Sequence, residues 1–147
     1  MQKALDFPLG RTQQRKAKMN YLMGTYYEKL GKDKMAKVYY EKAAGELAEG
    51  TEFLFYKGLA LQKLGQNQKA LEQYNALTEL ANKEEEIDFY RSFETGSKGN
   101  AYYAQKQYIR GLAYLGLNKK QEAKSEFAKA IESDPSHVWS KVHLSSL

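Results

Sequence analysis

The sequence predicts an all-α fold, a right-handed α-solenoid built from helix-turn-helix repeats. The first observation is a skeleton of small and aromatic residues that returns after 34 positions, from Gly24 to Gly58. The second is a further copy at Gly111, which lies 53 positions after Gly58, one period plus 19 residues. The third is the spacing of apolar residues within each copy, at threes and fours, which is typical of amphipathic helices. Because a fixed period of about 20–50 residues is typical of solenoids, we expect three repeats with an insertion between the second and the third.

The first repeat is expected to pair two helices, one over about residues 15–30 and one over about residues 34–48. Gly31 follows the first helix at the place where a left-handed residue commonly ends a helix. Gly50 and Thr51 interrupt the pattern after the second helix, and Thr51 is of the type that caps a helix N-terminus.

The second repeat is expected to place its helices over about residues 52–64 and 67–82, with Gly65 ending the first of them. The helical pattern then loses register in the insertion. Residues 95–100 have the composition of a loop, because glycine, serine and asparagine cluster there. The aromatic and apolar residues within 87–93 indicate that this earlier part of the insertion packs against something.

The third repeat restores the helical pattern over about residues 101–115 and 121–133. Asn118 occupies the place that Gly31 and Gly65 hold in the earlier repeats, and asparagine is the next-best residue for a left-handed conformation. Residues 138–144 form a short amphipathic segment, which we expect to be a capping helix that covers the end of the stack.

The N-terminal residues combine a helix-end signal with local positive charge. Residues 1–9 resemble the end of a helix stopped by Pro8, so we expect the chain to begin in the second helix of an earlier repeat. Residues 1–20 carry a net charge of +4 out of +5 for the whole chain. This segment is interpreted either as a basic arm or as a solvated connector.

The bulk composition excludes several classes of function. The chain has no cysteine, which excludes disulfides, thiolate nucleophiles and cysteine metal sites. No apolar run is long enough to span a membrane. Nucleic-acid binders usually spread their cations along a face, whereas residues 21–147 are nearly balanced at +1. We therefore expect no nucleic-acid or membrane partner, and a soluble protein for which the cytoplasm is slightly favoured over the periplasm.

The repeated positions resemble the tetratricopeptide repeat. With Gly24, Gly58 and Gly111 as position 8, that pattern places small residues at positions 8 and 20, an aromatic residue at 24 and a small residue at 27. Leu77 at position 27 departs from the pattern, as do Lys57 and Arg110 at position 7, where leucine is usual. The resemblance implies one domain over 1–147, with units 17–50, 51–84 and 104–137, an insertion over about 85–103 and a cap over 138–147.

The resemblance also implies a function, the binding of a peptide or a neighbouring domain on a concave face formed by the first helix of each pair. Tyr21, Phe55 and Tyr108 would form an aromatic spine along that face. Tyr21 and Thr25 replace the lysine and asparagine with which related repeats clamp the C-terminal tails of chaperones, so that ligand class is not expected. The candidate binding residues are Lys18, Tyr21, Thr25, Glu28, Phe55, Leu59, Gln62, Tyr108 and Leu112.

Two other functions stay open from the sequence. The aromatic face could bind a small molecule or a glycan, since the stretch also resembles repeat arrays of large bacterial proteins of unknown function, some of them associated with carbohydrate utilisation. The chain could instead be a purely structural segment of a longer array. No catalytic constellation or cofactor motif is present, and His137 and His143 fit surface or capping roles better than metal ligation. We therefore expect a protein that is not an enzyme and has no cofactor.

Overall fold

The computed structural model describes residues 15–83 and 96–147, and it divides the chain into two compact units. Unit 1 is Met1–Gln73 and unit 2 is Tyr74–Leu147, so the boundary falls inside helix α5 (Asn67–Asn82). The regular structure in the described ranges is helical, as the sequence predicts. Within those ranges no helix is long and apolar enough to cross a membrane.

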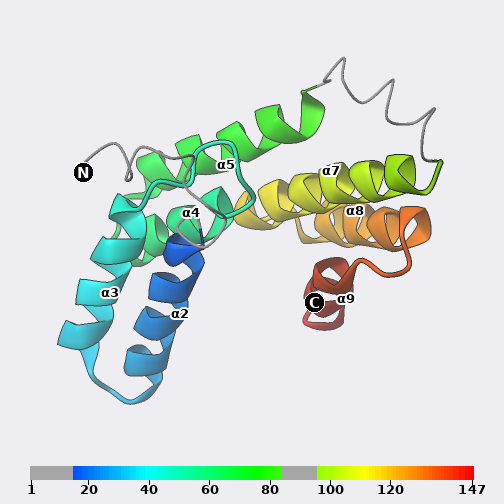
Figure 1. Ribbon diagram of the computed structural model, residues 1–147. Helices are drawn as coiled ribbons and strands as arrows, with labels where there is room; N and C mark the ends of the chain where they lie inside the picture. The colour runs from blue at the N-terminus through cyan, green and yellow to red at the C-terminus, as the bar shows by residue number, and fades with distance from the viewer. Residues whose placement is uncertain (1–14, 84–95) are drawn as a thin grey trace, which may run out of the picture. The chain divides into compact units, whose positions relative to one another are not determined.

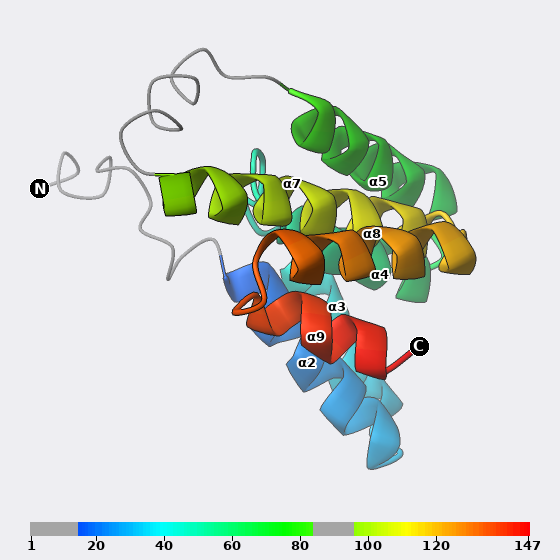
Figure 2. The ribbon, with the colours of Figure 1, turned by 90° about the vertical axis from the view of Figure 1, so that its right-hand side faces the viewer.

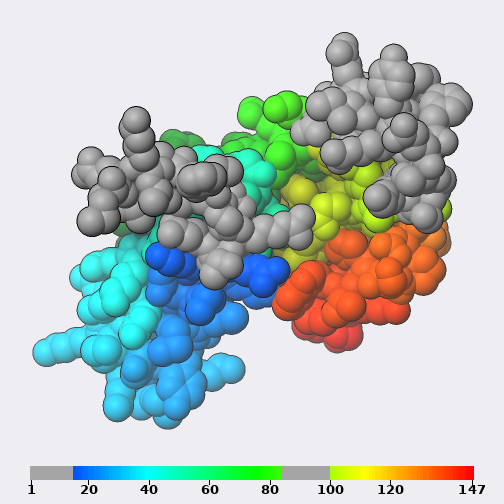
Figure 3. Space-filling view, viewed as in Figure 1, coloured from blue at the N-terminus to red at the C-terminus, as the bar shows by residue number. Residues whose placement is uncertain are grey.

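Unit 1 is organised around a hairpin of two helices. Helix α2 (Lys16–Lys29) and helix α3 (Asp33–Gly45) lie side by side, and α4 (Leu54–Lys63) packs against both (Figure 1). Figure 3 shows the side chains of α2, in blue, and of α3, in cyan, reaching the surface of this unit. Thr51 is not the N-cap that was expected, because α4 begins at Leu54 with Phe53 in the N-cap position. The Thr51 hydroxyl instead accepts a hydrogen bond from the Phe53 backbone N–H at 3.2 Å, in the turn before the helix.

A left-handed residue ends the first helix of each pair, as predicted. Gly31 has φ +75° after α2, Gly65 has φ +77° after α4, and Asn118 has φ +63° in the third repeat. Each allows the chain to reverse within three residues and begin the next helix.

The core of unit 1 depends on a glycine that makes room for a ring. A Cβ on Gly24 would lie 2.6 Å from Cδ1 of Tyr40, so only glycine lets α2 approach α3 this closely. Tyr40 is 5% exposed and forms a core with the alanines Ala36, Ala43 and Ala60. Small residues on both helices thus create the space that one aromatic ring fills.

Unit 2 contains a second hairpin with the same packing. Helices α7 (Gly96–Gly116) and α8 (Lys120–Ser133) run side by side (Figure 1 and Figure 2). A Cβ on Gly111 would lie 2.7 Å from Cδ1 of Phe127, which repeats the relation between Gly24 and Tyr40. The ring of Tyr74 lies against Gly116 in the same way.

One prediction is wrong at the start of α7. We expected a loop over residues 95–100, but the helix begins at Gly96. Local glycine content favours a loop, yet extending an existing helix adds one hydrogen bond for each residue fixed and so costs little. The other expectations for the insertion, and those for residues 1–14, fall outside the described residues.

The C-terminal helix α9 (Val138–Ser145) packs against α8, where a capping helix was expected. His137 caps it, because its Nδ1 accepts a hydrogen bond from the Ser140 backbone N–H at 3.3 Å. His143 stacks on Phe127 of α8, with ring centroids 5.4 Å apart. Both histidines therefore serve the attachment of this helix.

Candidate binding surface

The predicted binding residues lie on three helices. Lys18, Tyr21, Thr25 and Glu28 are on α2, and Phe55, Leu59 and Gln62 are on α4. These two helices pack together in unit 1. Tyr108 and Leu112 are on α7 in unit 2. The structure thus packs together the two helices that carry seven of these residues, and the surface that α2 and α4 share in unit 1 is called here the α2–α4 face.

Tyr21 is the centre of the α2–α4 face. Its half-buried ring lies 5.8 Å from the ring of Tyr40 on α3 and 5.9 Å from the ring of Tyr56 on α4. Burial raises the pKa of Tyr21, and burial raises the pKa of Tyr56 to about 12. Both phenols therefore stay neutral at physiological pH, and together the rings form an uncharged aromatic cluster.

Lys18 adds a cation at one end of this cluster. Its Nζ lies 5.4 Å from the centroid of the Tyr56 ring, within the range of a cation–π interaction. Burial lowers the pKa of Lys18, as does the nearby Arg15, while Glu52 opposes the shift. A partly desolvated ammonium interacts more strongly with a carboxylate than a fully hydrated one, so this position is suited to an acidic group.

Glu28 adds an anion at the other end of α2. Its carboxylate accepts hydrogen bonds from the Tyr40 hydroxyl and from Lys63 Nζ, the latter at 3.0 and 3.1 Å. The hydrogen bond from Tyr40, followed by that from Lys63, lowers the pKa of Glu28. One carboxylate thus ties together α2, α3 and α4. A pocket of about 300 Å³ beside it is lined in part by Asp33 and Lys37.

Thr25, Leu59 and Gln62 complete the surface. The Thr25 hydroxyl donates to the Leu22 carbonyl of its own helix at 2.7 Å, which leaves its methyl group and the acceptor lone pairs of its oxygen for a ligand. Leu59 is half-buried and Gln62 is exposed. The α2–α4 face therefore combines partly buried rings, a threonine methyl, a leucine and charges of both signs.

The predicted aromatic spine is wrong at two of its three rings. Phe55 is 4% exposed and Tyr108 is 3% exposed, and Leu112 of the same predicted face is fully buried. Tyr108 contacts Phe127, His137 and His143 within unit 2, so it belongs to the core there. For Tyr108 the cause is the capping segment, whose two histidines cover a ring that the repeat pattern alone assigns to the surface.

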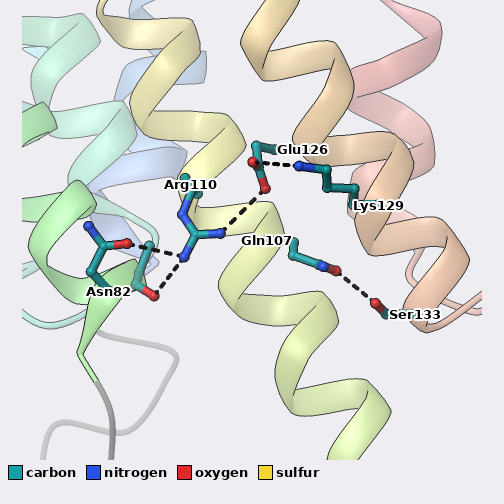
Figure 4. Close-up of polar contacts among 7 residues, drawn as sticks. Asn82, Gln107, Arg110, Glu126, Lys129 and Ser133 are labelled. Atoms are coloured by element: carbon teal, nitrogen blue, oxygen red, sulfur yellow. Dashed lines mark hydrogen bonds and ion pairs between the residues drawn. The ribbon is translucent and has the colours of Figure 1, made fainter.

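Sequence reasoning also missed a polar network in unit 2 (Figure 4). Arg110 contacts Glu126 of α8 at 3.5 Å and donates to the Ala81 carbonyl at 3.4 Å and to Asn82 Oδ1 at 3.1 Å. Lys129 also contacts Glu126, at 3.4 Å. The network joins the end of α5 to α7 and α8, and its sequence signal was the arginine that stands at position 7 in place of leucine.

Comparison with known families adds one finding. The family model described as tetratricopeptide repeat matches residues 17–45, 51–90 and 104–137. These stretches cover more than half of the chain and begin at the same residues as the three expected units, but the first two end at residues 45 and 90 and not at 50 and 84. No curated protein matches the chain.

Proposed function

Since this chain belongs to the tetratricopeptide repeat family, whose members generally serve as protein–protein interaction modules, we propose that it binds a peptide segment of a partner protein on the α2–α4 face. The peptide is expected to place an apolar or aromatic side chain against Tyr21 and Leu59, and an acidic side chain near Lys18. Aromatic anchors commonly supply most of the binding energy at such surfaces.

The observation that carries this proposal is the arrangement around Tyr21. A half-buried ring held between Tyr40 and Tyr56 is rigid, so a ligand that packs on it need not order it first. Lys18 lies over Tyr56 at one edge, and Glu28 with Lys63 lies at the other. An apolar centre flanked by charged groups is typical of peptide-binding surfaces.

The proposed role is non-catalytic, and the environment of the titratable groups supports it. Glu28 is paired with Lys63, and Glu126 with Arg110 and Lys129. The hydrogen bonds from Tyr40 and from Lys63 lower the pKa of Glu28, the opposite of the raised pKa that a carboxyl general acid needs near neutral pH. These contacts account for both carboxylates as structural groups.

A glycan site on this face receives less support. Sugar rings stack on open aromatic faces, whereas Phe55 is buried and Tyr21 is held within a cluster of rings. A thermal-shift screen against a glycan collection that produced a stabilising hit would restore this alternative.

The proposed function can be tested by selecting ligands from a random-peptide library displayed on phage, using the wild-type chain as bait. The affinity of each selected peptide is then measured for Lys18→Glu and for Lys34→Glu. The second variant is a matched control, because it makes the same charge change in unit 1 at an exposed position on α3 that does not line the pocket beside Glu28. We expect Lys18→Glu to bind at least about tenfold more weakly, or about 1.4 kcal/mol, and Lys34→Glu to bind like the wild type. Equal effects of the two variants would show that the peptides bind elsewhere or only through net charge.

A further inference from the structure

A second surface of unit 1, on α2, carries a continuous row of exposed apolar side chains. Its five residues recur at threes and fours, so they share one side of the helix. Their exposed fractions range from 38% to 60%, which is high for large apolar side chains. This row is called here the α2 stripe, and it consists of Met19, Leu22, Met23, Tyr26 and Leu30.

The repeat register shows what covers the same positions elsewhere in unit 1. The stripe occupies positions 3, 6, 7, 10 and 14 of the first unit, counted from residue 17. In the second unit, Phe53, Tyr56 and Ala60 hold positions 3, 6 and 10 on α4 or just before it, and all three are buried. Ala60 packs with Ala36, Tyr40 and Ala43 of α3, the second helix of the preceding pair.

The same relation holds on the first helix of the third unit. Ile109 and Ala113 hold positions 6 and 10 on α7, and both are buried. Lys106, at position 3, donates to the Leu80 carbonyl near the end of α5 at 2.8 Å. Arg110, at position 7, reaches Ala81 and Asn82 there. The second helix of the preceding repeat, here α5, therefore again lies on these positions of the first helix.

The capping helix α9 continues the pattern. Ser140 and His143 stand where positions 3 and 6 of a following unit would be. Ser140 is fully buried, and His143 stacks on Phe127 of α8. In each of these three helices, this face is therefore the one that receives a preceding helix, whereas on α2 it is exposed.

The charges beside the stripe narrow the choice of partner. Arg15 and Lys16 stand at its N-terminal end and Lys29 at its C-terminal end, and all three are exposed. On a helix of 3.6 residues per turn, Lys16 and Lys29 fall on opposite sides of the stripe. Glu28 lies on the far side of α2, where it bonds Tyr40 and Lys63. A second copy of this chain would bring two basic rims together, whereas an acidic helix would complement them.

We propose that the α2 stripe docks an amphipathic helix of a partner, one whose apolar stripe is flanked by aspartate or glutamate. The helix would extend the helix-on-helix interface seen at α4, α7 and α9. Met19 and Met23 occupy the positions that Lys106 and Arg110 hold on α7. On α7 these two cations bind carbonyl groups at the end of the preceding helix. The two methionines make the contact on α2 apolar, so the docked helix does not need to present such carbonyl groups. Methionine adapts its shape readily, which suits it to such a surface.

An anionic membrane is the competing ligand, since a helix with an apolar side and basic flanks can also lie on a lipid surface. The register argues for a helix, because this face receives a protein helix in the three cases described above. The proposal is separate from peptide binding on the α2–α4 face, and either can fail without the other.

The test uses a synthetic helical peptide of about 18 residues, long enough to retain helicity in water, with leucines along one side and glutamates flanking them. A matched peptide carries lysines in place of the glutamates. Isothermal titration calorimetry with the wild-type chain is expected to show binding of the glutamate peptide at least about tenfold tighter than the lysine peptide. The preference should shrink as salt is raised, because salt screens exposed charges.

Two variants locate the binding. The double variant Leu22→Gln with Tyr26→Gln should bind the glutamate peptide at least about tenfold more weakly, although the net charge of the chain is unchanged. Leu47→Gln is the matched control, since Leu47 is 61% exposed and lies outside the stripe, and it should bind like the wild type. Equal thermal unfolding midpoints for all three proteins would show that folding is intact. If only the double variant loses stability, Lys16→Glu with Lys29→Glu provides the second test. This variant should bind the lysine peptide more tightly than the glutamate peptide.

Several results would overturn the proposal. Equal affinity for both peptides would contradict an acidic partner. Binding of neither peptide would contradict docking of a partner helix, and is the result expected if an earlier helix of the same chain occupies this face. A wild-type dimer in sedimentation that Leu22→Gln with Tyr26→Gln dissociates would assign the stripe to self-association. Binding to vesicles containing phosphatidylglycerol, together with no binding of the glutamate peptide, would assign it to a lipid surface.

Discussion

Gly24 and Gly111 hold the same place in two hairpins, and in both the absence of a side chain is the structural requirement. Each lies under an aromatic ring of the next helix, Tyr40 in the first case and Phe127 in the second. The repeat pattern predicts this pairing, because a small residue at position 8 recurs with an aromatic one at position 24. The residue scale is therefore where the sequence is most informative about packing.

Gly24→Ala should destabilise the chain, because its new methyl group would lie 2.6 Å from Cδ1 of Tyr40. The ring cannot easily turn away, since its hydroxyl is bonded to Glu28. Overpacking of this kind costs about 1–3 kcal/mol, more than the higher helix propensity of alanine returns. Gly45→Ala is the control, as no atom lies within 4 Å of its added Cβ. Urea unfolding should separate the two, and equal stability of both variants would contradict the packing role.

The lowered pKa of Glu28 predicts that the stability of the chain depends on pH. The hydrogen bonds from Tyr40 and Lys63 lower the folded-state pKa of Glu28 from 4.5, so the contribution of this carboxylate to stability is present above that value. The contribution is lost as the pH falls through the lower, folded-state pKa. The difference in unfolding free energy between the wild type and Glu28→Gln should therefore be constant near neutral pH and should narrow in acid. A difference that stays constant from neutral to acid pH would show that the carboxylate makes no such contribution.

The Glu28 contacts could not be predicted from the sequence. Glu28 lies 12 residues before Tyr40 and 35 before Lys63, and neither spacing carries a local signal. Their meeting depends on how α4 packs against the first hairpin. The same holds for Tyr108, whose burial depends on the histidines of the C-terminal segment.

At the scale of elements, the ends of the first helix of each pair were predicted more reliably than their starts, whereas α3 ends at Gly45, before the expected residue 48. Gly31, Gly65 and Asn118 adopt the left-handed conformation that their residue types favour. The start of α7 at Gly96 was missed, because a run of glycine and serine favours a loop locally while helix propagation opposes it. A rule based on local sequence succeeds where a single residue decides the backbone conformation. It fails where the neighbouring turns of a helix also influence that conformation.

The prediction at the scale of elements concerns Arg110, which joins α7 to Glu126 of α8. Replacing it by leucine leaves Glu126, 8% exposed, without its partner on α7 and should cost about 1–3 kcal/mol. Arg110→Leu with Glu126→Leu should recover most of that loss, because apolar residues can replace a buried ion pair with little net effect. Lys129→Leu is the control and should change stability by less than about 0.5 kcal/mol, since Lys129 is mostly exposed. A double variant less stable than Arg110→Leu would contradict this account of the network.

At the scale of the whole molecule, the period of the sequence predicted the family and the helix-turn-helix architecture. The three matched stretches begin at the same residues as the units that the resemblance to the tetratricopeptide repeat implies. The period could not predict which faces stay exposed, since it gives every first helix the same register. Exposure depends on what covers each helix, which is why the α2 stripe and the buried Tyr108 were both found only in the structure.

The most direct test of the central claim is a nuclear magnetic resonance titration of the wild-type chain with a peptide selected from the library. If the α2–α4 face binds it, the largest amide shifts should fall within residues 18–28 and 55–62, and Lys18→Glu should reduce them at equal peptide concentration. Shifts concentrated on α8 and α9, or no saturable shifts at all, would contradict the assignment of peptide binding to this face.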